Sequence, residues 1–407
     1  MTTALLPTSS EQRFHALDLI RGVAVLGILI MNIYGFSNIF AYYMNPYALG
    51  EPSSSDVWVW SITHIFADQK FYTLFSMLFG AGIMLMAERA KSQHLSAAKY
   101  HYRRVFWLLI FGLIHALLIW LGDILFMYAC MGLWVYLFTD TSAKTKLITG
   151  IVLVALYSIY MAMVSIYIDK IPAEDIEFMF NMFYPDQATI QEETLPYLTS
   201  FAAQVEHRVD FFKENVLSMG LGFGIFRIGG SMLIGMALYQ YGVLTAARST
   251  KFYLLLLAIC FTVGFLITAY DMKTLFANNF AFEDLLLSFM TTTNVAALFI
   301  AVGYIALLAL WCKSSSNGII RKAFEAVGRM AFTNYIAQSL ICTTIFYSFG
   351  FGLFTELARL QLMGIVAIVF LVQLFWSSWW LKRFHYGPLE WLWRSLTYGK
   401  LQAFRKH

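Results

Sequence analysis

Residues 18–40 read DLIRGVAVLGILIMNIYGFSNIF, a mostly apolar run with an aspartate and an arginine near its start. About 20 consecutive apolar residues span the hydrocarbon core of a bilayer as a helix. Nine more runs of this kind follow, at 62–87, 105–121, 123–139, 147–168, 216–242, 252–270, 288–311, 328–349 and 361–381. The sequence therefore predicts an all-α, polytopic membrane helix bundle of about 10 transmembrane helices.

The composition supports a membrane protein. The chain of 407 residues is 59% hydrophobic and 13% charged, whereas soluble domains carry about 25% charged residues. The net charge of +4 is modest and the basic residues are spread over many short segments, so we expect membrane lipids and a small molecule as partners, and no nucleic acid. The four cysteines lie in or beside apolar runs without metal-ligand spacing, so we expect buried thiols and no metal.

Lysine and arginine set the predicted orientation. Three of the 28 Lys and Arg, namely Arg21, Lys70 and Arg227, lie within the apolar runs. If the N-terminus is inside, 20 of the other 25 lie in segments on the inner side of the membrane. Cytoplasmic segments of membrane proteins carry this excess. We therefore expect the N-terminus and the C-terminus to be cytoplasmic.

The chain has no evident boundary between domains, so we expect a single integral membrane domain over 1–407. Two five-helix parts cover 1–168 and 216–381, and a basic cytoplasmic tail covers 382–407. The segment 169–215 is a long, acidic extracytoplasmic loop, which either holds an interfacial helix or is irregular. No internal repeat is evident, so the inverted repeats of many transporters are missing.

Basic residues within the apolar runs are the first site candidates. An ionisable group in hydrocarbon costs roughly 2.5–3.5 kcal/mol and usually faces the bundle interior or a wet cavity. Arg21 follows Asp18 by three positions, so the two either form a local ion pair or bind an anionic ligand from the cytoplasm. Arg227 lies in a glycine-rich run, where a buried guanidinium needs a partner, and we expect it to bind an anion.

A second set of candidates lies near the outer boundary of the second run. Asp68 and Lys70 are two positions apart, so they point to different faces of a continuous helix. Lys70 either extends to the outer surface or joins Asp68 in binding a ligand. His64 lies beside tryptophans, and we expect it at the membrane interface.

His115 is the candidate for acid–base chemistry, because a histidine titrates near neutral pH. It is either a general base or a hydrogen-bonded packing residue. Asp123 is either an N-cap or the partner that orients His115. Asn334 and Gln338, four positions apart, make hydrogen bonds between helices or contact a ligand.

Segments along the whole chain resemble the YeiB family of bacterial membrane proteins, whose function is not settled. They are LDLIRG (17–22), GILIMN (27–32), KF (70–71), LFSMLFGAG (74–82), GLIH (112–115), GDIL (122–125), YA (128–129), GRMAFTNYIAQS (328–339), YGPLEWLWR (386–394) and LTY (396–398). The resemblance implies a multi-pass protein of the bacterial inner (plasma) membrane.

The LDxxRG pattern at 17–22 is also similar to that of transmembrane acyltransferases such as heparan-alpha-glucosaminide N-acetyltransferase. Those proteins bind acyl-CoA from the cytoplasm and modify a sugar on the far side. Asn32 matches the asparagine in the first helix of that enzyme. Its catalytic histidine lies in the next loop, where this chain has Tyr42 and Tyr43 but no histidine. Either another residue such as His115 acts as the base, or the chemistry differs.

The resemblance and the polar residues together lead to a first hypothesis, a transmembrane acyltransferase. Acyl-CoA binds near Arg21 and the basic tail, and His115, oriented by Asp123, takes a proton from an acceptor hydroxyl or amine. Asn32 or Arg227 stabilises the oxyanion. The acceptor is an extracytoplasmic sugar, lipid or envelope group.

The alternative hypothesis is a transporter or export factor for an anionic solute or lipid. Asp68, Lys70, Asp123 and Arg227 then line the pathway, and His115 relays protons. A third hypothesis is a scaffold whose polar groups only hold the helices together. The sequence leaves open the acceptor, the acyl chain and the oligomeric state, with a homodimer as one option.

Overall fold

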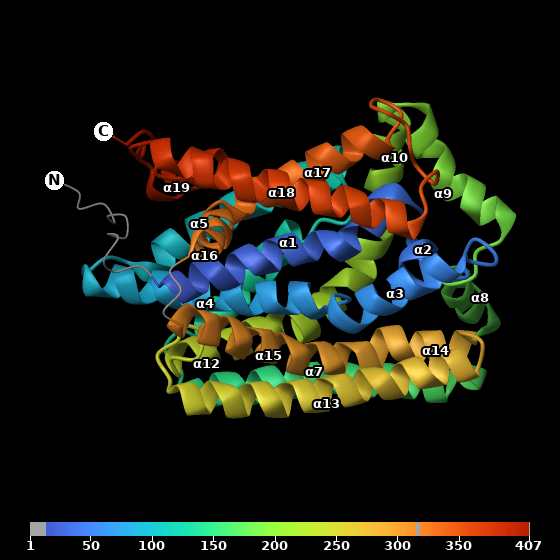
Figure 1. The fold of residues 1–407 in the computed structure, drawn as a ribbon, viewed down its shortest axis with the longest axis horizontal. Coiled ribbons are helices and arrows are strands. Elements are labelled where there is room, and N and C mark those ends of the chain that lie inside the picture. The colour runs from blue at the N-terminus through green and yellow to red at the C-terminus, as the bar shows by residue number, and fades with distance from the viewer. Residues whose placement is uncertain (1–13, 315–317, 407) are drawn as a thin grey trace.

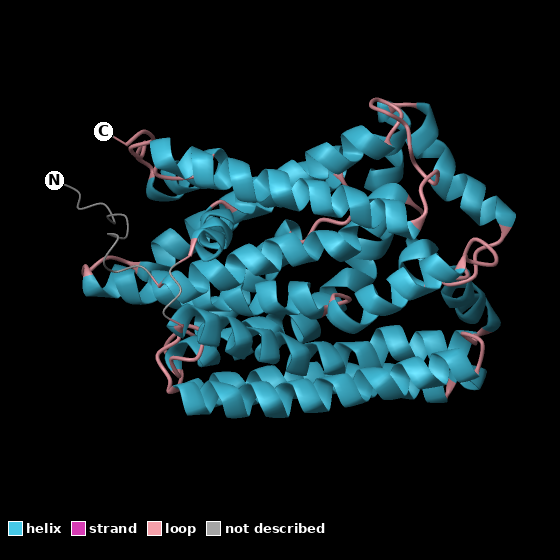
Figure 2. Ribbon diagram, viewed as in Figure 1, coloured by secondary structure: helices cyan, strands magenta, loops and turns pink. Residues whose placement is uncertain are grey.

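The structure is a computed structural model that describes residues 14–314 and 318–406. Within these residues the chain forms helices and no strand, apart from a single bridge between Phe384 and Arg405. Figure 1 and Figure 2 show most of the long helices side by side along the long axis of the molecule. Eight helical segments of the described chain are long and apolar enough to cross a membrane. The prediction of an all-α, multi-pass membrane bundle is confirmed.

The helices follow the predicted runs closely. The eight long segments are α1 (His15–Ser37); α3 (Ser54–Phe66) with α4 (Lys70–Ser92); α5 (Ala97–Ile114) with a π-helical turn (His115–Ile119); α7 (Ala143–Ile166); α11 (Leu221–Phe223) through to α12 (Gly230–Gln240); α13 (Thr250–Ala277); α14 (Phe282–Leu287) through to α15 (Thr293–Lys313); and α18 (Arg359–Arg383). The predicted runs 123–139 and 328–349 form shorter helices, α6 (Leu125–Val135) and α17 (Ala331–Phe346). The number of spans and the side on which the termini lie stay predictions.

The prediction of one continuous helix over 62–87 is wrong. The chain breaks between α3 and α4 at residues 67–69, where Gln69 has a φ of 59°. This left-handed conformation does not occur inside an α-helix. Because of the break, Asp68 and Lys70 do not follow helical spacing, and both side chains enter one buried cluster described below.

The predicted outer loop 169–215 is mainly helical. It contains α8 (Ala173–Asn181), α9 (Gln187–Thr199) and α10 (Phe201–Phe211), which gather at one end of the bundle, on the right in Figure 1. α10 runs on through π-helical turns toward α12, so the helix expected from 216 begins earlier. The remaining helices are α2 (Phe40–Met44), α16 (Ile319–Arg329) and α19 (Pro388–Tyr398). The segment is thus helical and not irregular, and an interfacial location of these helices stays a prediction.

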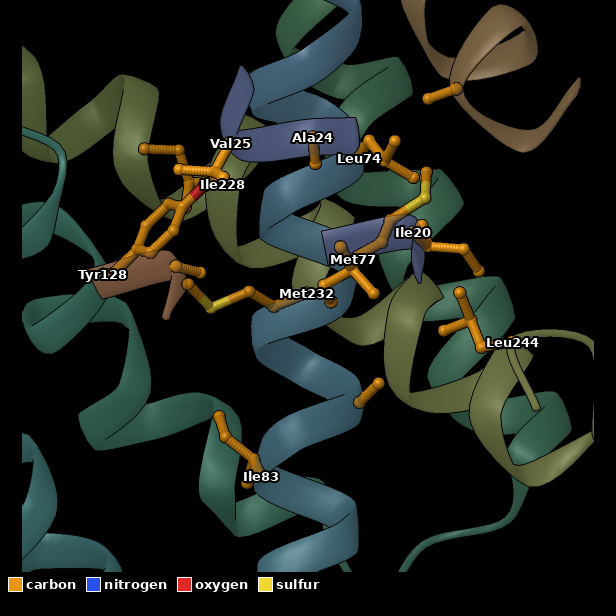
Figure 3. Close-up of a cluster of buried hydrophobic side chains, with 14 of the residues drawn as sticks. Ile20, Ala24, Val25, Leu74, Met77, Ile83, Tyr128, Ile228, Met232 and Leu244 are labelled. Carbon is orange, nitrogen blue, oxygen red and sulfur yellow. The ribbon is translucent and has the colours of Figure 1, made fainter. Parts of the chain in front are cut away.

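The core of the bundle forms around α1. In its most apolar stretch 78% of α1 is buried, against 22% for α7 and for α13, which therefore lie at the lipid-facing edge. α1 packs on α4, and Figure 3 shows Ala24, Met77 and Met232 within one cluster of buried side chains. At Gly80 the backbones of α4 and α12 come so close that a Cβ would lie 2.0 Å from the Met232 carbonyl oxygen. Small residues allow such packing in membrane bundles.

Candidate functional site

A cavity of about 260 Å³ lies among α1, α4, α5, α6, α17 and α19. Along α4 its lining extends from Arg89 to Phe75, which corresponds to about 20 Å of helix. The lining between these residues is largely apolar and includes Leu78, Phe79, Leu85 and Leu108. The cavity is therefore elongated and offers mainly hydrocarbon contacts.

One end of the cavity is strongly basic. Five half-buried arginines line the cavity as a whole: Arg21, Arg89, Arg104, Arg329 and Arg394. Arg104 lies nearer the middle, where its Cζ is 6.0 Å from the Phe79 ring centroid. At the other end the lining residues Tyr128 and Tyr335 are buried. Arg21 donates to Asp18 over 3.1 Å, so the local ion pair is present, and both residues also line the cavity. A ligand role for Arg21 and Asp18 stays a prediction.

The tail helix α19 is part of the cavity wall. Trp393 stacks on Arg104, with 4.4 Å from the guanidinium carbon to the ring centroid, and its Nε1 donates to the Arg104 carbonyl oxygen over 2.9 Å. Glu390 accepts from the backbone N–H groups of Phe332 and Thr333 over 2.7 and 3.0 Å. Burial raises the pKa of Glu390. Since free N–H groups at a helix N-terminus attract a carboxylate, Glu390 caps α17 and fixes the tail to the bundle.

His115 lies between an aspartate and a serine. Its Nδ1 is 2.8 Å from Asp123 Oδ1, and its Nε2 is 2.8 Å from Ser339 Oγ. Asp123 also accepts from the backbone N–H of Phe126 over 2.6 Å, as an N-terminal cap. A carboxylate only accepts, so the imidazole donates from Nδ1, and Nε2 is free to accept from the serine hydroxyl. The order carboxylate, imidazole, hydroxyl is that of nucleophilic triads.

Arg208 of α10 holds the segment that carries His115. Its Nε, Nη1 and Nη2 donate to the carbonyl oxygens of Leu117, Ile119 and Leu118 over 3.1, 3.3 and 3.3 Å. Its side chain is 1% exposed. The guanidinium thus satisfies carbonyl groups that the π-helical turn leaves free at its end.

The buried end of the cavity lies close to His115. The Tyr335 ring lines the cavity and its centroid is 5.2 Å from that of the His115 ring. Ser339 follows Tyr335 by one helical turn of α17. On α1, Ile28 lines the cavity and Asn32 follows one turn later. Trp120 connects this part of α1 to the histidine, because its Nε1 donates to the Gly35 carbonyl over 3.2 Å and its ring centroid is 6.3 Å from that of His115.

A second buried cluster surrounds His64. Its Nδ1 is 3.1 Å from Asp68 Oδ2, and its Nε2 is 3.1 Å from Asp271 Oδ2. Tyr43 donates to Asp68 over 2.7 Å, and Ser288 donates to Asp271 over 2.7 Å. A neutral imidazole has one N–H, so the two contacts together require one more proton, on the ring or on a carboxyl group. His64 is 5% exposed and therefore faces the interior of the bundle, and its location at the membrane interface stays a prediction.

Lys70 and Arg227 are also part of this cluster. Lys70 is fully buried and donates to the His64 carbonyl oxygen over 2.6 Å, so the expectation that it extends to the surface is wrong. Arg227, also fully buried, donates to the Asn294 side chain and, over 3.0 Å, to the Thr73 hydroxyl. Its hydrogen bonds within the described chain go to neutral groups. An anion at Arg227 stays a prediction.

Asn334 and Gln338 join α17 to α18. Asn334 donates to the Ser377 hydroxyl over 3.0 Å, and Gln338 donates to the Gln373 side chain over 2.9 Å. Gln338 also donates to the Val25 carbonyl oxygen of α1 over 3.1 Å. These are the hydrogen bonds between helices that the sequence predicts.

The structure thus separates the predicted site residues into groups. Asp18 and Arg21 lie at the basic end of the cavity. His115 and Asp123 lie near its buried end, and Asn32 lies on the adjoining turn of α1. Asp68, Lys70 and Arg227 belong to the second cluster. Sequence reasoning missed Ser339, Glu390, Arg208, Tyr43, Asp271 and Asn294 as site residues. Asp271 lies just past the expected end of its run. Ser339 and Glu390 lie inside GRMAFTNYIAQS (328–339) and YGPLEWLWR (386–394), two of the segments that resemble the YeiB family. Their place in these motifs is the feature of the sequence that could have identified them.

Among the described residues no group of three or more His, Cys, Asp and Glu is arranged to hold a metal ion. In the second cluster the two carboxylates lie on opposite nitrogens of His64, not around a common point. The four cysteines are free thiols, with Cys260 and Cys342 buried and Cys130 and Cys312 half-buried.

Comparison with known proteins shows what the chain resembles. Residues 238–400 match the family model described as "Protein of unknown function (DUF418)". The chain is 32% identical over 388 residues to the uncharacterized protein YeiB of Escherichia coli (strain K12), covering 95% of this chain and 96% of that protein. It is 30% identical over 420 residues to the uncharacterized protein YxaH of Bacillus subtilis (strain 168), covering 99% of each. No solved structure matches at a significant level. The chain belongs to the YeiB family of membrane proteins of unknown function, as its sequence motifs predict.

Proposed function

We propose that this protein is a membrane acyltransferase of the bacterial inner membrane. It moves an acyl group from cytoplasmic acyl-CoA to an extracytoplasmic sugar, lipid or envelope acceptor. The observation that carries the proposal is the elongated cavity, which is lined by five arginines and has the Asp123–His115 pair next to its buried end. Acyl-CoA has the matching chemistry, since phosphates lie at one end of the molecule and the acyl group at the other.

The arginines supply the binding site for the phosphates. Guanidinium groups bind phosphate through paired, charge-assisted hydrogen bonds. The apolar lining between Phe75 and Leu85 holds the acyl-bearing arm. Residues of the basic tail line the cavity, and the tail is cytoplasmic in the predicted topology.

His115 is the general base in this proposal. Asp123 holds the ring so that Nε2 can take a proton. Of the two residues expected to stabilise the oxyanion, Asn32 lies one turn beyond the cavity lining on α1, whereas Arg227 is engaged with Asn294 and Thr73. Asn32 is therefore the better candidate.

Binding of acyl-CoA to the purified protein tests the proposal. Arg104→Gln is expected to weaken binding of acetyl-CoA and palmitoyl-CoA about tenfold or more, because a charged hydrogen bond contributes about 1.5–3 kcal/mol. Arg383→Gln, an exposed arginine that is not among the cavity-lining residues, is the control and is expected to bind normally. Absence of acyl-CoA binding to the wild-type protein would refute the acyltransferase.

The second candidate function is a transporter for an anionic solute or lipid, with proton coupling. The observation in its favour is the buried cluster of His64, Asp68, Asp271 and Lys70 beside a helix break. Intramembrane ionisable groups often form proton pathways. Proton flux into liposomes under an imposed potential, abolished by Asp68→Asn and insensitive to acyl-CoA, would favour this function over the first.

A further inference from the structure

We infer that Ser339 is a nucleophile that accepts the acyl group, so that transfer passes through an acyl-serine. This inference rests on the proposed function and deepens it, because direct transfer to the acceptor needs only the histidine and the aspartate.

The direction of the Ser339 hydroxyl is the first argument. Buried serines in helices commonly donate to the carbonyl oxygen four residues earlier. Ser76, Ser158 and Ser231 do so here over 2.8, 3.0 and 2.8 Å. For Ser339 the same distance, to the Tyr335 carbonyl, is 3.4 Å, while His115 Nε2 is 2.8 Å away. The hydroxyl is turned from its helix toward the histidine.

The surroundings of the histidine are the second argument. Because Asp123 accepts from Nδ1, the tautomer leaves Nε2 as an acceptor facing Ser339. This arrangement raises the nucleophilicity of a serine hydroxyl. Arg208 fixes the turn that carries His115, which keeps the ring in place.

The position of Ser339 relative to the cavity is the third argument. Tyr335 and Ser339 lie on the same face of α17, about 6 Å apart along the axis. Tyr335 lines the cavity and its ring packs against the His115 ring at 5.2 Å. A thioester at the buried end of the cavity is therefore one helical turn from the hydroxyl, and the Tyr335 ring must turn aside to admit it.

The proposed step is balanced. Ser339 Oγ bonds to the thioester carbonyl carbon, and the carbon–sulfur bond breaks. The hydroxyl proton passes to His115 Nε2 and from there to the leaving sulfur, which gives free CoA. In the second half, the acceptor hydroxyl or amine attacks the acyl-serine, gives its proton to His115, and Ser339 leaves with that proton. No oxidant or further reactant is needed.

The experiment uses the full chain in detergent, without acceptor. One sample receives a fluorophosphonate, and others receive radiolabelled acetyl-CoA or palmitoyl-CoA, followed by peptide mass spectrometry. The expected result is modification of Ser339 by both reagents. Ser339→Ala is expected to lose labelling by both reagents. His115→Gln is expected to slow labelling about a hundredfold or more. Ser339→Cys is expected to form a hydroxylamine-sensitive thioester with the acyl group of acyl-CoA. Ser158→Ala, which removes another buried serine, is the control and keeps full labelling.

The outcomes separate the two proposals. If acyl-CoA binds or acyl transfer occurs and Ser339 stays unmodified in the folded protein, the acyl-serine is overturned and direct transfer stands. If the fluorophosphonate labels Ser339 but no acyl-CoA binds, the nucleophile is supported and the donor of the proposed function is overturned. The Ser339→Cys variant covers a folding defect in Ser339→Ala, since it keeps a nucleophile of similar size.

Discussion

At the scale of single residues, burial of charge is the main feature of this protein. Lys70 and Arg227 are fully buried, and Asp68 and Asp271 are nearly so. Each would be costly in hydrocarbon without a partner. They are tolerated because His64 connects the two carboxylates and because backbone and amide oxygens receive the cationic donors.

Asp271→Ala tests the second cluster. We expect a loss of about 3–5 kcal/mol in the free energy of unfolding, because the change leaves the imidazole of His64 with one carboxylate partner. Thermal or denaturant unfolding in detergent measures it. Asp169→Ala, which removes an exposed carboxylate paired with Lys170, is expected to change stability little. Equal stability of the two variants would show that the buried contact is not important for the fold.

At the scale of elements, two segments remote in sequence hold the helices of the site. α10 comes from the outer segment and caps the turn after His115, and α19 comes from the tail and caps α17. Both act through one charged side chain placed on the free backbone groups of a helix end. The geometry of the proposed site therefore depends on elements that contribute no reacting group.

Arg208→Gln is expected to loosen the turn at residues 115–119. The guanidinium makes hydrogen bonds to three carbonyl oxygens, and loss of charged bonds costs about 1.5–3 kcal/mol. Hydrogen exchange of peptides that cover this turn should accelerate. Lys213→Gln, an exposed residue shortly after α10, is the comparison. Unchanged exchange in Arg208→Gln would show that the turn is held by other contacts.

Glu390 makes a prediction about pH. Burial raises the pKa of Glu390 in the folded protein, whereas in the unfolded chain it is about 4.3. The folded state therefore binds the proton more tightly, and the contribution of Glu390 to stability is greatest below the unfolded pKa and is lost as pH rises through the folded pKa. The unfolding temperature of the wild-type protein should therefore fall as pH rises through the folded pKa of Glu390. Glu390→Gln, which cannot titrate, should show a smaller fall. An identical pH profile for Glu390→Gln and wild type would contradict it, and the exposed Glu283→Gln is the control.

At the scale of the whole molecule, the bundle has a basic end and an end covered by α8, α9 and α10 (Figure 1). The cavity arginines and the tail lie at the first end. The excess of Lys and Arg in the same segments predicts, by the positive-inside rule, that this end is cytoplasmic. The proposed reaction depends on this orientation, because the donor is cytoplasmic and the acceptor is not.

Cysteine labelling tests the orientation. In a variant that lacks the four native cysteines, Glu177→Cys is expected to react with a membrane-impermeant maleimide in intact spheroplasts. Lys400→Cys should react only after the membrane is opened. Both side chains are exposed. The reverse pattern would invert the topology and remove the cytoplasmic donor.

The sequence by itself determined the membrane bundle, the position of most helices and the family, since apolar length and ordered motifs are local properties of the chain. It also indicated His115 with Asp123, which lie eight positions apart around one tight turn. The tertiary structure alone decided the rest. Ser339 reaches His115 from 224 positions away, and Asp271 reaches His64 from 207 positions away. Such contacts depend on how helices pack, and the break at Gln69 depends on a buried cluster that no local pattern contains.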